Sequence, residues 1–124
     1  MISNVSSAYI QISDLLEAIS SPVRIQILLA IGVNEVCVCH LENLLGLRQA
    51  YISQQLMALR EKEIITARRE GKYIYYRLAK PETLQIVQLA SQSVGVVDAS
   101  QNISMELLPV VAAPCECPKC KEEV

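Results

Sequence analysis

The sequence lacks both tryptophan and phenylalanine, and its five aromatic residues are all tyrosines. Hydrophobic residues still make up 52% of the 124 positions, so the core must be built from aliphatic side chains. This length fits one domain, or one domain with a tail. A small aliphatic helical protein often completes its core by dimerising, because a short chain alone buries too little surface.

Long apolar runs and a secretory leader are also absent. The longest apolar run, ILLAIGV, is far shorter than the roughly 20 residues of a membrane span. The N-terminal MISNVSSAYIQ has neither a basic region nor an apolar one. We therefore expect a cytoplasmic protein with no membrane partner. In that compartment an odd number of cysteines, five, argues against a disulfide framework and for metal or redox chemistry.

Catalytic arrangements are missing as well. The sequence has no nucleophile–base pair, phosphate-binding glycine loop or paired carboxylates, so we expect no enzyme. Cys117-Pro-Lys-Cys120 has the spacing of a thiol oxidoreductase. It lies, however, in the C-terminal tail and not at a helix start after a strand.

The net charge is −2, yet the basic side chains are concentrated in one segment. Residues 48–80 hold eight basic and three acidic side chains, a net charge of +5, whereas the rest of the chain carries −7. Such segregation is an electrostatic footprint for nucleic acid that the whole-chain charge hides.

The order of the predicted elements indicates a mainly α fold with a β-hairpin. Apolar periodicity predicts helices over 8–19, from Pro22 to near Gly32, over 37–45, over 48–62 and from Pro81 to about 94. Ser21 is expected to cap the second helix and Gly46 to end the third. Two β-rich runs, 65–69 and 72–78, predict the hairpin. This succession is typical of a winged helix-turn-helix.

The helix predicted over 48–62 has the outer face expected of a DNA-reading helix. Its apolar Ile52, Leu56 and Leu59 share one face, whereas the opposite face carries short and amide side chains instead of charges. Glutamine can bond bidentately to adenine, and basic residues at the hairpin tip would meet phosphates. The predicted DNA contacts are Gln49, Ala50, Tyr51, Ser53, Gln54, Arg68, Arg69 and Lys72. The alternative is a plain surface helix followed by a solvated loop.

These segments resemble the ArsR/SmtB family of metal-responsive repressors. The run VCVCHL, residues 36–41, is similar to the family's ELCVCDL metal motif, and ISQQLMALREKEIITARREGKYIYYRL is similar to its reading helix and wing. The resemblance covers about residues 10–94. It implies a homodimer, joined through its first and last helices, that represses a double-stranded DNA operator and is released by metal.

Two departures from the family pattern leave the upstream motif with only two thiols. His40 replaces the Asp after the second cysteine, and Glu42 stands where the arsenic-type pattern has a third cysteine. The family's other common site, on the last helix, needs Asp and His ligands. Residues 81–94 contain no Asp, His or Cys, which argues against that zinc-type site.

We hypothesise that the C-terminal tail folds back to complete a thiolate site. The candidate ligands are Cys37, Cys39, Cys115, Cys117 and Cys120. Three sulfurs suit As(III), Sb(III) or Pb(II), and four suit Cd(II) or Zn(II); we expect As(III) or Sb(III) first and Cd(II) or Pb(II) next. Positions i and i+2 of a regular helix point about 200° apart, so we expect ion binding to unwind the turn at Cys37 and Cys39 and strain the reading helix.

The predicted organisation has three parts. Residues 1–94 form the DNA-binding and dimerisation domain, 95–114 a linker or C-terminal arm, and 115–124 a cysteine-rich metal-binding tail. Several alternatives stay open. The tail binds an ion of its own, His40 is a fourth ligand, or Cys37 and Cys39 are small buried hydrophobes. The chain as a whole is a thiol redox-sensing repressor on the same fold, or a cytosolic metal buffer.

Overall fold

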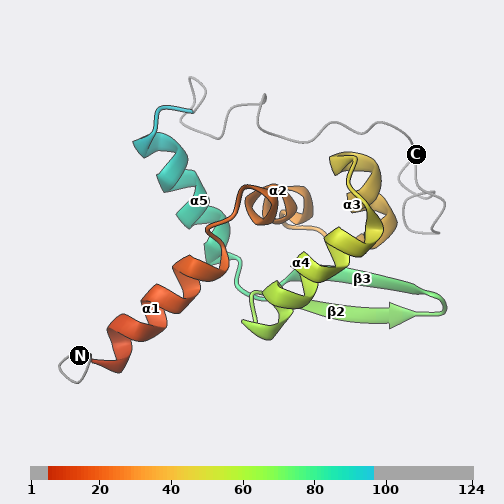
Figure 1. Ribbon diagram of the computed structural model, residues 1–124, viewed down its shortest axis with the longest axis horizontal. Coiled ribbons are helices and arrows are strands. Elements are labelled where there is room, and N and C mark those ends of the chain that lie inside the picture. Colours follow the sequence, from red (N-terminus) through yellow and green to blue (C-terminus); the bar gives the residue numbers. More distant parts are fainter. Residues whose placement is uncertain (1–5, 97–124) are drawn as a thin grey trace.

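The computed structural model describes residues 6–96 (Figure 1). Within this range the elements are α1 (Ser7–Ala18), α2 (Pro22–Ile31), β1 (Val36–Cys37), α3 (Val38–Leu45), α4 (Gln49–Glu61), β2 (Ile65–Glu70), β3 (Tyr73–Leu78) and α5 (Glu82–Ser93). The mainly helical winged helix-turn-helix predicted from the sequence is confirmed. The predicted cysteine-rich tail and nearly all of the predicted 95–114 linker lie outside the described residues.

Local signals place the helix boundaries close to their predicted positions. The Ser21 side chain accepts a hydrogen bond from the Arg24 backbone N–H, and Pro22 opens α2. Gly46 ends α3 in the left-handed region, with φ of 65°. That turn directs the chain from α3 into α4, the reading helix of the motif.

The start of the third helix was predicted wrongly, because a strand before it was missed. The third helix begins at Val38 and not at Cys37, because Val36 and Cys37 form a short strand, β1. This strand pairs antiparallel with β3, Val36 opposite Tyr76 and Cys37 opposite Tyr75. Cys37 then serves as the N-cap of α3, its sulfur accepting the His40 backbone N–H at 3.3 Å.

The sheet has the order β1-β3-β2, so β3 is its central strand. The pairing of β2 with β3 runs from Ile65 opposite Leu78 to Glu70 opposite Tyr73, which forms the wing. Gly71, with φ of 62°, lies in the turn at the wing tip. Figure 1 shows this hairpin extending away from the helices, with α4 alongside it.

The core is aliphatic, as the absence of Trp and Phe requires. Ile27, Leu28 and Ile31 of α2 are fully buried at its centre. Side chains from every other element pack around them, chiefly Leu41, Ile52, Leu56, Leu59, Ile64, Ile65, Leu78 and Val87. The predicted core face of the reading helix is therefore confirmed.

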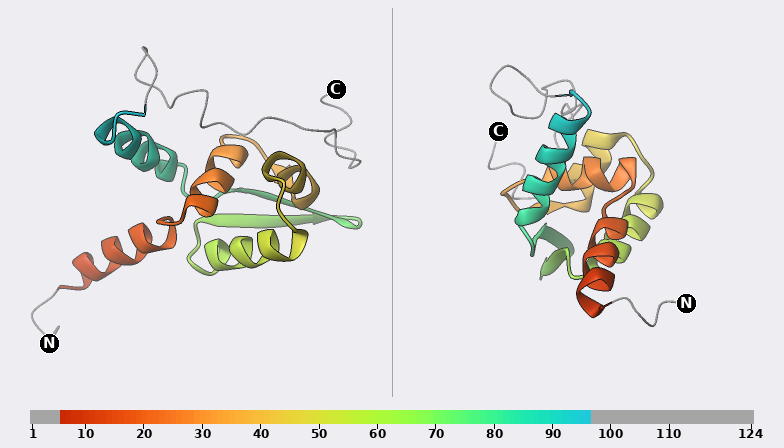
Figure 2. Two further views of the ribbon diagram at one scale, coloured as in Figure 1. Left: turned by 45° about the horizontal axis from the view of Figure 1, so that its top comes forward. Right: turned by 90° about the vertical axis from the view of Figure 1, so that its left-hand side faces the viewer.

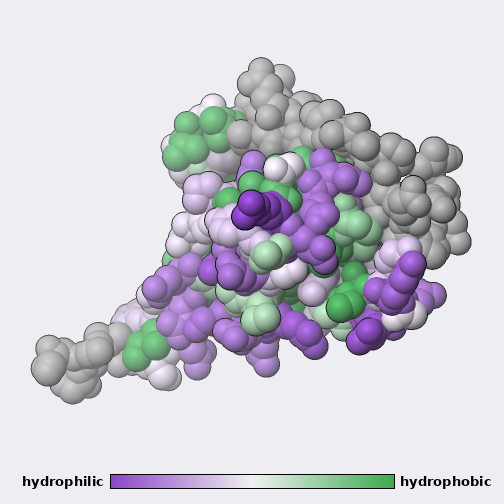
Figure 3. All heavy atoms as spheres, turned by 45° about the vertical axis from the view of Figure 1, so that its right-hand side comes forward, coloured by the Kyte–Doolittle hydropathy of each residue, from purple (hydrophilic) through white to green (hydrophobic). Residues whose placement is uncertain are grey.

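Helices α1 and α5 lie at the end of the molecule opposite the wing (Figures 1 and 2). Much of their apolar surface is exposed in the single chain, including Tyr9, Ile12 and Leu16 on α1 and Leu89 on α5. Figure 3 shows a small group of apolar side chains, in green, on the arm at the lower left. A helix with such a face normally buries it against another element.

No helix among the described residues is long and apolar enough to cross a membrane.

Candidate DNA-binding surface and thiol pair

The N-terminal half of α4 presents its polar side to solvent. Gln49, Ala50, Tyr51 and Gln54 are exposed and Ser53 is half-buried, while Ile52 is buried beneath them. All five predicted contact residues of the helix therefore lie away from the core. They are held at the end where a reading helix reaches base edges in a major groove.

A buried-side contact fixes the orientation of α4. The Arg24 guanidinium of α2 donates from Nε to Gln55 Oε1 of α4 at 2.9 Å and from Nη1 to the Ala18 carbonyl oxygen of α1 at 3.0 Å. One side chain thus joins three helices. It links α1, which carries an exposed apolar face, to α4, the predicted reading helix.

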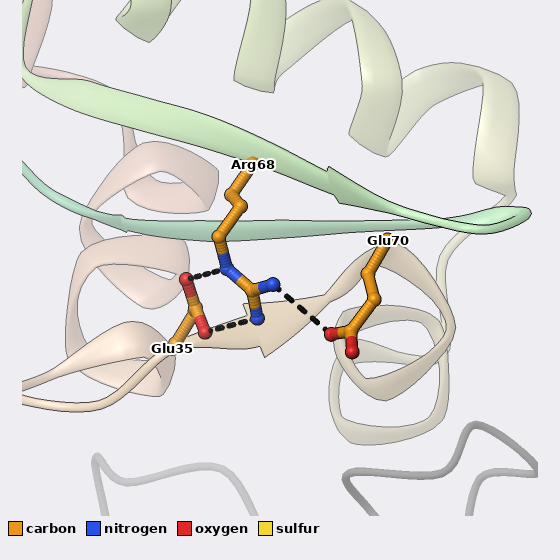
Figure 4. Close-up of polar contacts among 3 residues, drawn as sticks. All are labelled: Glu35, Arg68 and Glu70. Carbon is orange, nitrogen blue, oxygen red and sulfur yellow. Dashed lines mark hydrogen bonds and ion pairs between the residues drawn. The ribbon is translucent and has the colours of Figure 1, made fainter.

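In the wing, Arg68 is held by two carboxylates (Figure 4). Its side chain crosses β3 to reach Glu35, just before β1, donating from Nη2 and Nε at 2.8 and 3.0 Å. Its Nη1 donates to Glu70 at 3.0 Å. The hydrogen bonds that Arg68 donates to Glu35, and then to Glu70, raise its pKa above the ordinary value. A DNA phosphate would have to compete with both carboxylates, so contact between Arg68 and DNA stays a prediction.

The other two predicted wing cations make different contacts. Arg69 donates from Nε to the Gly71 carbonyl oxygen at 3.2 Å, and the Lys72 ammonium lies 5.5 Å from the centre of the Tyr73 ring. Both residues are exposed at the wing tip. Within residues 6–96, the described ion pairs of the wing are those of Arg68. Arg69 and Lys72 therefore keep their charge available for a phosphate.

Cys37 and Cys39 lie side by side. The structure pairs them as a disulfide, with their Cα atoms 5.4 Å apart. The expected opposition of the two side chains on a regular helix is wrong, since Cys37 is extended (φ −91°, ψ 166°) and only Cys39 is helical. Both sulfurs can therefore meet one partner without unwinding α3.

Two sulfurs alone do not complete a metal site. Among residues 6–96 no three His, Cys, Asp or Glu side chains are grouped so as to hold an ion. His40 therefore does not form such a group with the two cysteines in this structure. Cys115, Cys117 and Cys120 lie outside the described residues, so the hypothesis that they complete the site stays a prediction. The two adjacent thiols fit part of a soft-ion site and leave it short of ligands.

The family follows from comparison with known proteins. The model of the bacterial regulatory protein, arsR family, matches residues 21–67. The biofilm growth-associated repressor of Xylella fastidiosa is 38% identical over 77 residues, covering 62% of this chain and 68% of that protein. This chain belongs to the ArsR family.

Two further relatives of this ArsR-family chain bear on its chemistry and assembly. The arsenic resistance transcriptional regulator ArsR1 of Pseudomonas putida is 48% identical over 67 residues, 54% of this chain and 50% of that protein. A solution structure of a homodimeric winged helix-turn-helix DNA-binding domain from Mycobacterium bovis superposes with a TM-score of 0.62 at 27% identity. That match covers 71% of this chain and 84% of that one.

Sequence analysis missed four polar or aromatic residues of this ArsR-family chain that organise its surfaces. They are Arg24, Glu35, Gln55 and Tyr75. Alternation along Tyr73–Leu78 is a signal that places Tyr75 and Arg77 on one face of the strand. The contacts of Glu35 and Arg24 join residues 33 and 31 positions apart, and no local pattern marks them.

Proposed function

We propose that this chain is a transcriptional repressor that binds operator DNA as a homodimer and releases it when a soft thiophilic ion binds its cysteine thiolates. One observation carries the proposal: two cysteines lie side by side where β1 meets α3, in an ArsR-family winged helix-turn-helix, and reduction makes both available as thiolates. The helix that starts there packs directly on the reading helix. Chemistry at the thiols therefore acts close to the DNA-facing surface.

DNA binding rests on α4 and the wing acting together. The exposed amide and hydroxyl groups of α4 suit base edges, and Arg69 and Lys72 suit phosphates. Both surfaces fall within the segment whose net charge is +5. The Xylella relative is named a repressor, which supports this role.

Dimerisation rests on the uncovered apolar surface. A groove of about 690 Å³ lies between α1, α2 and α5, lined by residues that include Leu16, Ile25, Leu29, Ile86 and Val94. Together with the exposed Ile12 and Leu89, it gives a surface that a second copy would bury. The homodimeric Mycobacterium bovis domain supports this assembly.

The class of inducer rests on sulfur chemistry. Thiolates select soft ions, and three of them suit As(III) or Sb(III) whereas four suit Cd(II). Similarity to an arsenic resistance regulator favours As(III) and Sb(III), with Cd(II) and Pb(II) next. The remaining ligands would come from Cys115, Cys117 and Cys120. Coupling of this kind is reciprocal and typically amounts to about 1–3 kcal/mol, so DNA weakens ion binding by the same factor.

A second candidate is a thiol redox sensor on the same fold. The pairing of Cys37 with Cys39 in the structure favours it, because two adjacent cysteines can be oxidised to a disulfide. In that case oxidation instead of an ion would release DNA.

Fluorescence anisotropy on labelled DNA from upstream of the chain's own gene separates the candidates. The reduced protein would be titrated with As(III), Sb(III), Cd(II), Pb(II) and Zn(II), and separately with peroxide. Release by As(III) and Sb(III) at lower concentration than the others is expected. Release by peroxide alone would replace the ion sensor with the redox sensor, and indifference to all would refute both.

The matched control carries Ser at Cys115, Cys117 and Cys120. This variant should bind DNA normally and lose ion-driven release. Normal release by the variant would show that the tail supplies no ligand.

A further inference from the structure

Three side chains form a continuous row across the sheet, on the face opposite the main core. Cys37 of β1 lies opposite Tyr75 of β3, and Tyr75 lies opposite Arg68 of β2. Cys37 and Tyr75 pack together in a small buried cluster, each 2% exposed, with Cys39 and Tyr73 at its edge. The Arg68 guanidinium lies 5.0 Å from the centre of the Tyr75 ring. We call these three residues the Tyr75 row.

Glu35 connects the two ends of the Tyr75 row, Arg68 and Cys37. It holds Arg68 through two hydrogen bonds, and it precedes Cys37 by two residues, so alternation puts both side chains on the same face. Figure 4 shows Arg68 reaching over β3 to Glu35. In addition to the backbone pairing of β1 with β3, two side-chain contacts therefore attach the wing to the thiol-bearing strand, one through the Tyr75 ring and one through the ion pair.

We propose that Tyr75 is a positioning residue that couples the state of the Cys37–Cys39 pair to the wing. The two sulfurs are paired directly in the structure, so a ligand that binds between them must separate them, and this moves Cys37 relative to β3. Tyr75 packs beside Cys37, and its ring contacts Arg68. Displacement of Tyr75 therefore changes the conformation of the wing and leaves the aliphatic core, on the other face of the sheet, in place. This inference rests on the proposed function, and it specifies the wing as the part through which that function is regulated.

The ring, not the hydroxyl, carries the coupling. Packing against Cys37 and the cation–π contact with Arg68 both involve the Tyr75 ring. Tyr75→Phe should therefore preserve the coupling and Tyr75→Leu should weaken it. Tyr76→Leu is the matched control, since Tyr76 neighbours Tyr75 on the same strand but faces Val36 and Ala67 on the other side.

The test uses the full chain with Ser at Cys115, Cys117 and Cys120, so that only Cys37 and Cys39 react. After reduction, phenylarsine oxide bridges the two thiols, exchanging its oxygen, released as water, for two As–S bonds. Hydrogen exchange of the amides of residues 65–78 is then measured by mass spectrometry, without DNA. Bridging should change exchange in the wing when residue 75 is Tyr or Phe and should change it much less when it is Leu. The Tyr76→Leu control should respond like the parent.

Unchanged exchange in the Tyr75 parent, or an equal response in Tyr75→Leu, would overturn the inference. Because Tyr75 is buried, Tyr75→Leu can fail to fold. The double variant Glu35→Gln/Arg68→Gln then decides, since it breaks the second attachment at the surface and should also reduce the response. An undiminished response in the double variant would equally overturn the inference.

A DNA-binding measurement separates this inference from the proposed function. In the chain with all cysteines, Tyr75→Leu should bind the inducing ion normally but lower the ion-driven fall in DNA affinity by about fivefold or more, the lower end of a typical coupling. If no ion releases the unmodified chain while wing exchange still responds to bridging, the proposed function fails and the coupling stands. If ions release Tyr75→Leu as fully as the parent, the coupling fails and the function stands.

Discussion

The three cations of the wing differ in their contacts, and this difference leads to a measurable prediction. Arg68 is paired with two carboxylates, whereas Arg69 and Lys72 are exposed and contact a carbonyl oxygen and a ring. Arg69→Gln should therefore remove a phosphate contact. The double variant Glu35→Gln/Arg68→Gln keeps the net charge and should remove none.

The salt dependence of DNA binding gives the magnitude. Each phosphate contact contributes about −0.9 to the slope of log Kobs against log salt concentration. In a dimer, Arg69→Gln loses one contact per subunit, so the slope should become less steep by about 1.8. Between about 50 and 200 mM salt, the variant should then lose roughly tenfold less affinity than the unmodified protein. The charge-neutral double variant should change the slope by less than about 0.5.

Fluorescence anisotropy at four or five salt concentrations measures these slopes. Lys62→Gln, a basic residue outside the predicted contact set, controls for a general loss of positive charge. If the double variant flattened the slope as much as Arg69→Gln, Arg68 would be a phosphate contact and the carboxylates would give way to DNA. An unchanged slope in both Arg69→Gln and Lys72→Gln would mean that the wing tip does not touch phosphates.

Three further predictions concern stability and assembly. Leu56→Ala, on the buried face of α4 and 1% exposed, should lower the free energy of unfolding by about 2–5 kcal/mol in chemical denaturation; a loss well under 1 kcal/mol would mean that α4 is not anchored there. Gly46→Ala should cost about 1 kcal/mol through its φ of 65° alone, since a Cβ there meets nothing within 4 Å; a stabilised variant would contradict this reasoning. Ile12→Glu should leave the monomer folded by circular dichroism but raise the dimer dissociation constant in sedimentation equilibrium, because Ile12 is 56% exposed on α1; an undisturbed dimer would place the interface elsewhere.

Much of the fold could be predicted because its signals are local. The Ser21-Pro22 helix start, the Gly46 turn and the 3.6-residue periodicity of Ile52, Leu56 and Leu59 each depend on a few neighbouring residues. The hairpin could be predicted equally well, since its two strands are adjacent in the chain and joined by a glycine turn. These elements account for the order that identified the winged helix-turn-helix.

The rest depended on pairing between distant residues. Val36 and Cys37 are a strand only because β3, some 40 positions later, supplies their partners. A two-residue strand leaves no periodicity of its own, so the cysteine motif was assigned entirely to the helix. The same applies to Arg68, whose basic character predicted a phosphate contact while its principal partner, Glu35, lies 33 positions away. The local concentration of basic residues predicted a wing that contacts phosphates, but it could not show which of these residues would be held by carboxylates instead.

The brevity of β1 has a consequence for which residue faces the wing. Side chains of a strand alternate between faces, so a one-residue slip of β1 against β3 would exchange the environments of Val36 and Cys37. The thiol would then point into the aliphatic core, and a valine methyl would rest against Tyr75. Insertion or deletion of a single residue between α2 and β1 would thus remove the thiol from its partner Cys39 without altering any cysteine. The length of that connection is as much a determinant of thiol chemistry in this protein as the cysteines themselves.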